Sequence, residues 1–118
     1  MKKIFHLSNC STCKRIIGEL NEGAGFELQN IKEQNISGEE LDFMKEKVGS
    51  YEALFSRRAM KYRSMGLNEK QLTEDDYRKY ILEEYTFLKR PVVVIEEDVF
   101  AGNAKKTVAA AKACLGIE

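Results

Sequence analysis

Residues 3–31 contain a short apolar run, a stretch with helical spacing and a second extended run in direct succession. The run at 3–8 predicts a short buried strand, and apolar residues recur over 12–22 at the spacing of a helix that buries one face. Gly23 and Gly25 predict the end of that helix. Apolar and polar residues then alternate over 26–31, as in a half-buried strand. These three elements form a βαβ unit, so we expect parallel strands and a right-handed crossover.

The rest of the chain predicts further helices and one hairpin. Ser37 is a predicted N-cap of a helix that ends at Gly49, and Thr73 opens another helix that reaches about Glu84. The β-prone run 92–95 and residues 99–101 are joined by a tight turn at 96–98, which predicts an antiparallel hairpin. A final helix is expected over 104–115. This order of elements predicts an α/β domain with a four-stranded mixed sheet.

Length and charge narrow the class of protein. A chain of 118 residues predicts one domain over 1–118, with a core large enough to need no disulfides. Lysine plus arginine total 19 and aspartate plus glutamate total 19, so the formal net charge is zero. Because the chain carries no excess of positive charge, we expect no direct binding to nucleic acid. No apolar run is long enough for a membrane span. An odd number of cysteines and no leader sequence predict a reducing, cytoplasmic location.

Two cysteines separated by two residues, Cys10 and Cys13, lie where the first strand is expected to hand over to the first helix. The first turn of a helix presents unpaired N–H groups and the positive end of the helix dipole, which stabilise a thiolate. Lys14 and Arg15 add positive charge. We therefore expect Cys10 to be the nucleophile and the more shielded Cys13 to resolve a mixed disulfide formed on it.

Other interpretations of these residues stay open. The cysteine pair could be half of a zinc site, although only His6 and Cys114 remain as further ligands. It could also be a structural or accidental pair. His6, the only histidine, is either a satisfied strand residue or a group that tunes the thiols. Cys114 is expected to be a small buried residue of the last helix.

Several features together resemble one known family. The cysteine at the first strand–helix turn, the segment around Arg58, the sequence Lys89-Arg90-Pro91 before a valine run, and Gly102-Asn103 after the hairpin are all typical of it. Over essentially the whole chain, the sequence resembles the arsenate reductase family (ArsC/Spx-like) of the thioredoxin-like fold. The resemblance implies a four-stranded mixed sheet flanked by helices, with a helical insertion between strands 2 and 3.

The resemblance also implies an oxidoreductase and assigns its site. A cysteine attacks an oxyanion held by arginines, and an external thiol such as glutathione with glutaredoxin, or thioredoxin, completes the reduction without an organic or metal cofactor. The substrate would be a small oxyanion or a thiol. The resemblance places catalytic positions on Cys10, Arg58 and Arg90, with Arg57 as the substitute for Arg58 if the register slips. Cys13, the expected resolving thiol, completes the predicted catalytic set. Substrate binding falls on Asn9, Ser11, Thr12 and Pro91, and the Arg90–Pro91 bond is expected to be cis.

Two departures from the family pattern bear on function. Glutaredoxin-coupled arsenate reductases carry a third arginine beyond the hairpin, whereas residues 99–118 contain none and offer Lys105 and Lys106 instead. Their active loop also has a single cysteine, whereas this loop adds Cys13. The alternative prediction is a Spx-type transcriptional regulator, in which the cysteine pair would switch binding to the RNA polymerase α subunit.

Overall fold

The structure is a computed structural model that describes residues 2–117. The chain divides into two compact units, one made of Met1–Gln34 with Arg90–Glu118 and the other of Asn35–Lys89. The first unit contains the whole sheet, and the second consists of helices and connecting segments with one isolated β-bridge between Phe55 and Leu88. Among the described residues, none of the helices combines the length and apolarity that a membrane crossing requires.

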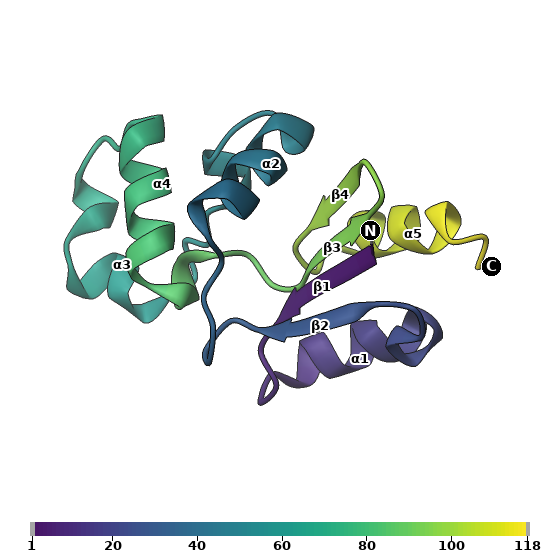
Figure 1. Ribbon diagram of the computed structural model, residues 1–118. Coiled ribbons are helices and arrows are strands. Elements are labelled where there is room, and N and C mark those ends of the chain that lie inside the picture. The colour runs from purple at the N-terminus through teal and green to yellow at the C-terminus, as the bar shows by residue number, and fades with distance from the viewer. Residues whose placement is uncertain (1, 118) are drawn as a thin grey trace. The chain divides into compact units, whose positions relative to one another are not determined.

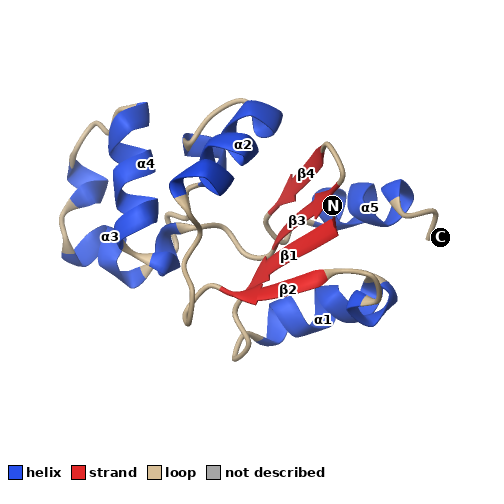
Figure 2. Ribbon diagram, in the orientation of Figure 1, coloured by secondary structure: helices blue, strands red, loops and turns tan. Residues whose placement is uncertain are grey.

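The sheet has four strands in the order β2-β1-β3-β4 (Figures 1 and 2). Strand β1 (Lys2–His6) pairs in parallel with β2 (Glu27–Asn30) and antiparallel with β3 (Val92–Ile95). Strand β3 pairs antiparallel with β4 (Asp98–Ala101), which completes the predicted hairpin. The mixed sheet is therefore confirmed, except that Asp98 belongs to β4 opposite Ile95, so the turn is shorter than predicted.

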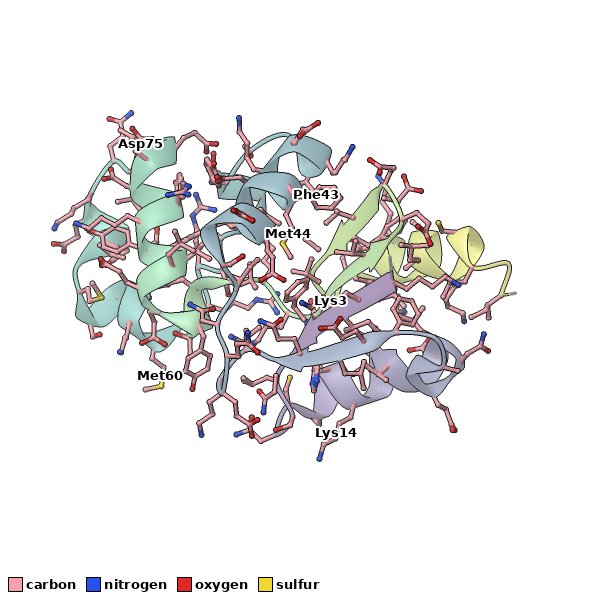
Figure 3. The ribbon with its side chains drawn as sticks, viewed as in Figure 1. Lys3, Lys14, Phe43, Met44, Met60 and Asp75 are labelled. Carbon is pink, nitrogen blue, oxygen red and sulfur yellow. The ribbon has the colours of Figure 1, made fainter. Side chains whose placement is uncertain are left out.

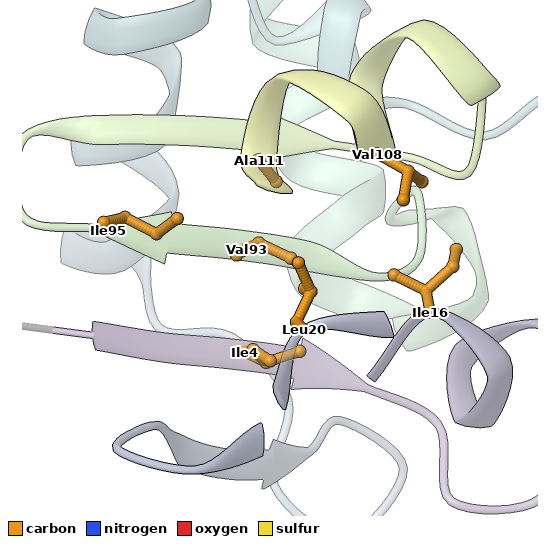
Figure 4. Packing of buried hydrophobic residues seen from close by; sticks show 7 residues of the cluster. All are labelled: Ile4, Ile16, Leu20, Val93, Ile95, Val108 and Ala111. Atoms are coloured by element: carbon orange, nitrogen blue, oxygen red, sulfur yellow. The ribbon is translucent and has the colours of Figure 1, made fainter. Parts of the chain in front are cut away.

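Helices α1 (Ser11–Glu19) and α5 (Lys105–Cys114) pack on the sheet through one apolar cluster (Figure 4). The strands contribute Ile4, Val93 and Ile95 to it. Ile16 and Leu20 come from α1 and the residue that ends it, and α5 contributes Val108 and Ala111. The small alanine lets α5 approach the sheet closely, so β1 and the start of α1 are held against a packed core.

Two details of the βαβ unit differ from the prediction. Helix α1 ends at Glu19 rather than near residue 22, because Asn21 and Glu22 adopt positive φ values of 56° and 55° that break the helix. In β2 the expected burial is reversed, since Leu28 is 47% exposed whereas Gln29 is buried. Strand β2 lies at the edge of the sheet, and Gln29 is satisfied there by donating from Nε2 to the Gln34 carbonyl at 2.8 Å.

The second unit is built from three α-helices: α2 (Gly38–Val48), α3 (Met60–Ser64) and α4 (Glu74–Glu83), with short 3-10 turns at Glu52–Leu54, Leu67–Glu69 and Tyr85–Phe87. Both predicted N-caps are confirmed. The Ser37 and Thr73 hydroxyls accept from the backbone of Glu40 and Asp76, whose carboxylates accept from the cap N–H groups in return.

An aromatic cluster forms the centre of this helical unit. The Phe55 ring stacks on Phe87 at 5.0 Å between centroids and lies 4.9 Å from the Tyr77 ring, with Tyr62 in edge contact at 5.9 Å. Rings at these distances contribute packing energy beyond their buried area. They tie the segment around α3 to α4 and to the turn that leads back to the sheet.

Candidate active site

The loop after β1 places Cys10 directly before α1. Cys10 is the N-cap residue of that helix, with φ −99° and ψ 115°. Its N–H donates to the Leu7 carbonyl at 3.1 Å, and its carbonyl accepts from the Lys14 N–H at 3.1 Å. These bonds hold the backbone on both sides of the residue, and its side chain is partly exposed. The Cys10 sulfur therefore sits over the first turn of α1, where unpaired N–H groups gather.

The environment of Cys10 favours its thiolate. Partial burial acts to raise the pKa of the Cys10 thiol, but hydrogen bonds and charge outweigh burial and hold that pKa below its usual value. The N–H and the thiol of Cys13 and the N–H of Thr12 donate to the Cys10 sulfur, and the positive charge of Arg90 adds to their effect. A lowered pKa raises the fraction of nucleophilic sulfur at neutral pH.

Cys13 has the opposite character. It is fully buried one turn into α1, and burial raises the pKa of its thiol to about 11. The Leu7 N–H lowers the pKa of Cys13, whereas the hydrogen bond from the Cys13 thiol to Cys10 and the charge of Cys10 raise it. The positive charge of Arg90 has a smaller effect and also lowers the pKa of Cys13. The two sulfurs therefore form a donor–acceptor pair, with Cys13 as the protonated partner. The contribution of Leu7 is a backbone contact, so no side-chain pattern in the sequence pointed to it.

Arg90 and Pro91 lie immediately before β3. The Arg90–Pro91 peptide bond is cis, as the resemblance implied. Pro91 is buried, and its carbonyl accepts from the Gly102 N–H at 2.9 Å, so this carbonyl is already engaged. Arg90 is half-buried and acts electrostatically on both thiols. The structure thus brings Cys10, Cys13 and Arg90 together within the first unit.

The cations next to the cysteines in sequence differ from the expectation. Arg15 donates to Glu19, with 3.1 Å between Nη1 and Oε2, and so is neutralised along its own helix. The Lys14 side chain projects away from the ribbon (Figure 3). The cation that acts on both sulfurs is Arg90, which is far away in the sequence.

The other loop residues have different surroundings. Asn9 and Ser11 are exposed, and Thr12 is half-buried with its N–H directed at the Cys10 sulfur. At the end of β1, His6 is also half-buried; burial lowers the pKa of its imidazole more than the Leu7 backbone raises it. Within residues 2–117, no three side chains of the His, Cys, Asp and Glu types gather as metal ligands would.

The two neighbouring arginines of the second unit are in different states. Arg57 donates to Glu52 at 2.7 Å and to the Tyr77 hydroxyl at 3.0 Å. Arg58 is exposed and has no hydrogen bond or ion pair to any residue between 2 and 117. Of the two, Arg58 is therefore the guanidinium whose donors are available to a ligand.

The prediction that Cys114 is buried is wrong. Cys114 is exposed at the end of α5, and its thiol lies 3.6 Å from Oδ2 of Asp98. The buried stripe of α5 is formed by Val108 and Ala111, and position 114 falls outside that stripe. Slight burial and the neighbouring Asp98 carboxylate raise the pKa of the Cys114 thiol, so it is the less reactive of the two accessible sulfurs.

Comparisons with known proteins agree with this architecture. An ArsC family related protein from Bacteroides fragilis superposes with a TM-score of 0.81 at 23% identity, covering 94% of this chain and 97% of the other. An arsenate reductase from Vibrio cholerae superposes with a TM-score of 0.72 at 25% identity, covering 99% and 97%. An arsenate reductase (ArsC) related protein from Brucella melitensis reaches 0.69 at 21% identity, covering 92% of each chain.

These likenesses confirm the thioredoxin-like fold with its helical insertion between strands β2 and β3. No curated protein sequence matches the chain. The model of the ArsC family matches residues 5–111, which run from the end of β1 through most of α5 and include both cysteines of the loop. The chain belongs to the ArsC family.

Proposed function

We propose that this protein is a thiol-dependent reductase in which the Cys10 thiolate is the nucleophile. The observation that carries the proposal is the pair of sulfurs with opposite acidity beside one cation. The pKa of Cys10 is held low by donors from Thr12 and Cys13, while Cys13 stays protonated with a pKa of about 11. A purely structural pair would have no need of an accessible, acidified sulfur.

Reduction of a disulfide substrate would proceed in two exchanges. The Cys10 thiolate attacks one substrate sulfur, a Cys10–substrate disulfide forms, and the other substrate sulfur leaves as a thiolate. Cys13 then loses its proton and attacks the Cys10 sulfur. This second step forms a Cys10–Cys13 disulfide and releases the remaining substrate thiolate, so that two electrons have passed from the protein to the substrate.

Reduction of an oxyanion such as arsenate would use the same nucleophile. Arg90 lies beside the thiols, and Arg58 offers an exposed guanidinium without a partner among the described residues. Planar guanidinium groups bind tetrahedral oxyanions through paired N–H donors. Cys10 would displace an arsenate oxygen, which leaves as water, to form a sulfur–arsenic bond. Attack by a second thiol on the Cys10 sulfur would then form a disulfide and leave arsenic reduced by two electrons.

The electrons must be replenished by an external thiol. If Cys13 resolves, the product is an internal disulfide that a dithiol such as thioredoxin reduces efficiently. If Cys13 does not reach Cys10, a monothiol such as glutathione, with glutaredoxin, must attack in its place. We propose no organic cofactor and no metal, since both routes need only sulfur and guanidinium groups.

The test is turnover of arsenate and of a small disulfide, each with thioredoxin and separately with glutathione plus glutaredoxin. We expect turnover with at least one pair, abolished in Cys10→Ser and slowed in Arg58→Lys and Arg90→Lys. Cys114→Ser is the matched control, because it removes an exposed sulfur outside the proposed site. Lack of turnover in all four assays, with Cys10→Ser behaving as the wild type, would remove the reductase proposal.

The same sulfurs would also suit the alternative of a Spx-type regulator, because forming a Cys10–Cys13 disulfide changes the charge and shape of the loop. That alternative predicts recovery of the RNA polymerase α subunit that differs between reducing and oxidising conditions. Equal or absent recovery under both conditions counts against it, whatever the reductase assays show.

A further inference from the structure

The last residue of β2 contacts the loop that carries Cys10. Strands β1 and β2 run in parallel with His6 opposite Asn30, so the two strands end side by side (Figure 1). The Asn30 side chain reaches across this end of the sheet and donates from Nδ2 to Oγ of Ser8 at 2.9 Å. Ser8 belongs to the loop between β1 and Cys10. Strand β2 therefore supports the cysteine loop from outside that loop.

The Asn30 side chain is itself held in one orientation. Its Oδ1 accepts from the Lys32 N–H at 3.2 Å. Because an N–H group can only donate, this contact directs the amide oxygen to Lys32 and leaves the NH2 group for Ser8. The Asn30 carbonyl also accepts from the N–H groups of Glu33 and Gln34, at 3.1 and 3.0 Å. The side chain that reaches the loop thus extends from a fixed backbone.

Two contacts from this end of β2 lie on either side of Leu7. Before Leu7, the His6 carbonyl accepts from the Ile31 N–H at 2.9 Å. After Leu7, the Ser8 hydroxyl accepts from Asn30. The backbone of Leu7 is therefore held on both sides by the last residue of β2 and the residue that follows it.

The backbone of Leu7 contacts both cysteines. Its carbonyl accepts from the Cys10 N–H at 3.1 Å, and its N–H donates to the Cys13 sulfur. The first of these bonds helps to hold Cys10 at the N-cap of α1, where the N–H groups of Thr12 and Cys13 reach its sulfur. A displacement of the turn from Leu7 to Cys10 would therefore misdirect the donors at both sulfurs.

We infer that Asn30 is a positioning residue for the cysteine pair, because through Ser8 it holds the turn from Leu7 to Cys10 in the conformation that directs donors at both sulfurs. Asn30 forms no hydrogen bond with either cysteine, so it acts only through the turn. The inference rests on the proposed role of Cys10 as the nucleophile. Ser8 is exposed and Asn30 half-buried, so water competes for the bond and its loss should change reactivity only a few-fold.

The test is the rate of Cys10 alkylation by iodoacetamide as a function of pH, measured in a Cys114→Ser background. Asn30→Ala removes the donor of the bond, and Ser8→Ala removes its acceptor. At pH values below the Cys10 pKa, we expect each variant to be alkylated about threefold more slowly than the wild type, and at pH values above it we expect the rates to converge. The double variant should be no slower than either single variant, since both changes remove the same bond.

A matched control on the same strand is Gln29→Ala. It removes the neighbouring side-chain bond, from Gln29 Nε2 to the Gln34 carbonyl at 2.8 Å, at a buried position. Urea unfolding should show that Gln29→Ala loses at least as much stability as Asn30→Ala, whereas its alkylation profile should match that of the wild type. Stability and cysteine reactivity are thereby measured separately.

Three results would overturn the inference: wild-type alkylation profiles in both Asn30→Ala and Ser8→Ala, additive slowing in the double variant, or equal slowing by Gln29→Ala. The last result would give Asn30 a general structural role. Alkylation needs neither a substrate nor an external thiol, so these outcomes can be read even if every reductase assay fails. Unchanged profiles would, in turn, leave the reductase proposal standing.

Discussion

Replacing Cys13 by alanine should make Cys10 less acidic, because Cys13 contributes a donor as well as a second sulfur. The Cys13 thiol donates to the Cys10 sulfur from a fully buried position. A hydrogen bond to a charged acceptor contributes roughly 1.5–3 kcal/mol, and a thiol is a weak donor, so about 1 kcal/mol is a reasonable share. That free energy corresponds to about a fivefold lower ratio of thiolate to thiol at Cys10 at a given pH.

Serine at the same position separates the two roles of Cys13. Its hydroxyl keeps a donor near the Cys10 sulfur, but it cannot form a disulfide. At pH values below the Cys10 pKa, we therefore expect Cys13→Ala to slow alkylation of Cys10 about fivefold and Cys13→Ser to leave it near the wild-type rate. Both variants should accumulate the mixed disulfide with a substrate thiol, because neither contains the resolving sulfur.

The assay is the rate of iodoacetamide alkylation of Cys10 as a function of pH, followed by mass spectrometry. It is run in a Cys114→Ser background, so that the other accessible sulfur does not contribute. If alanine and serine both leave the pH profile unchanged, the Cys13 thiol does not stabilise the Cys10 thiolate. If both slow the reaction equally, repacking of the helix start explains the effect and the donor argument fails.

Three further outcomes follow from the same contacts. Arg90→Gln should slow Cys10 alkylation about threefold at low salt, whereas Arg90→Lys should not, because the positive charge acts at a distance. Equal alkylation rates for the wild type and both variants would contradict this. Ile16→Ala should lower the free energy of unfolding by about 2–5 kcal/mol in urea titrations, and the partly exposed Ile17→Ala should cost clearly less. The pKa of Cys13 rises from 9.0 to about 11 on folding, so its contribution to stability is complete below pH 9 and is lost as pH rises to 11. The unfolding free energy of the wild type should fall by about 2 kcal/mol more than that of Cys13→Ala between pH 9 and pH 11, and parallel curves would refute this.

Local signals in the sequence were enough for the parts of the fold that depend on neighbouring residues. Ser37 and Thr73 start helices because their hydroxyls accept from N–H groups only three residues away, and such pairs are visible in the sequence. The alternation around Leu28 and Gln29 was misleading, because their burial depends on β2 being an edge strand. That position follows from the order of the strands, in which β2 pairs with β1 and β1 pairs with β3 on its other side, and no local pattern encodes it.

The candidate site also combines features that neighbouring residues encode with features that only the pairing of distant segments creates. The location of Cys10 before a helix was predictable from the apolar run on one side and the helical spacing on the other. The cation that acts on it was not, since Lys14 and Arg15 are adjacent in sequence while Arg90 reaches the sulfurs through the pairing of β3 with β1. The Leu7 N–H that favours the Cys13 thiolate is a backbone group and leaves no trace in the choice of side chain.

Besides burial, two effects of Cys10 keep Cys13 protonated: the hydrogen bond between the two sulfurs and the negative charge of the Cys10 thiolate. The resolving sulfur, Cys13, should therefore become more acidic once Cys10 has reacted. Burial raises the pKa of Cys13 first, and then the hydrogen bond to Cys10 and its negative charge raise it further. A mixed disulfide removes that charge, while the Leu7 N–H and Arg90 continue to favour the Cys13 thiolate. Cys10→Ser imitates the uncharged state, so the pKa of Cys13, followed by its Cβ chemical shift, should fall below about 11 in that variant. An unchanged titration would mean that burial alone sets the acidity of Cys13, and formation of the mixed disulfide would then do nothing to activate it.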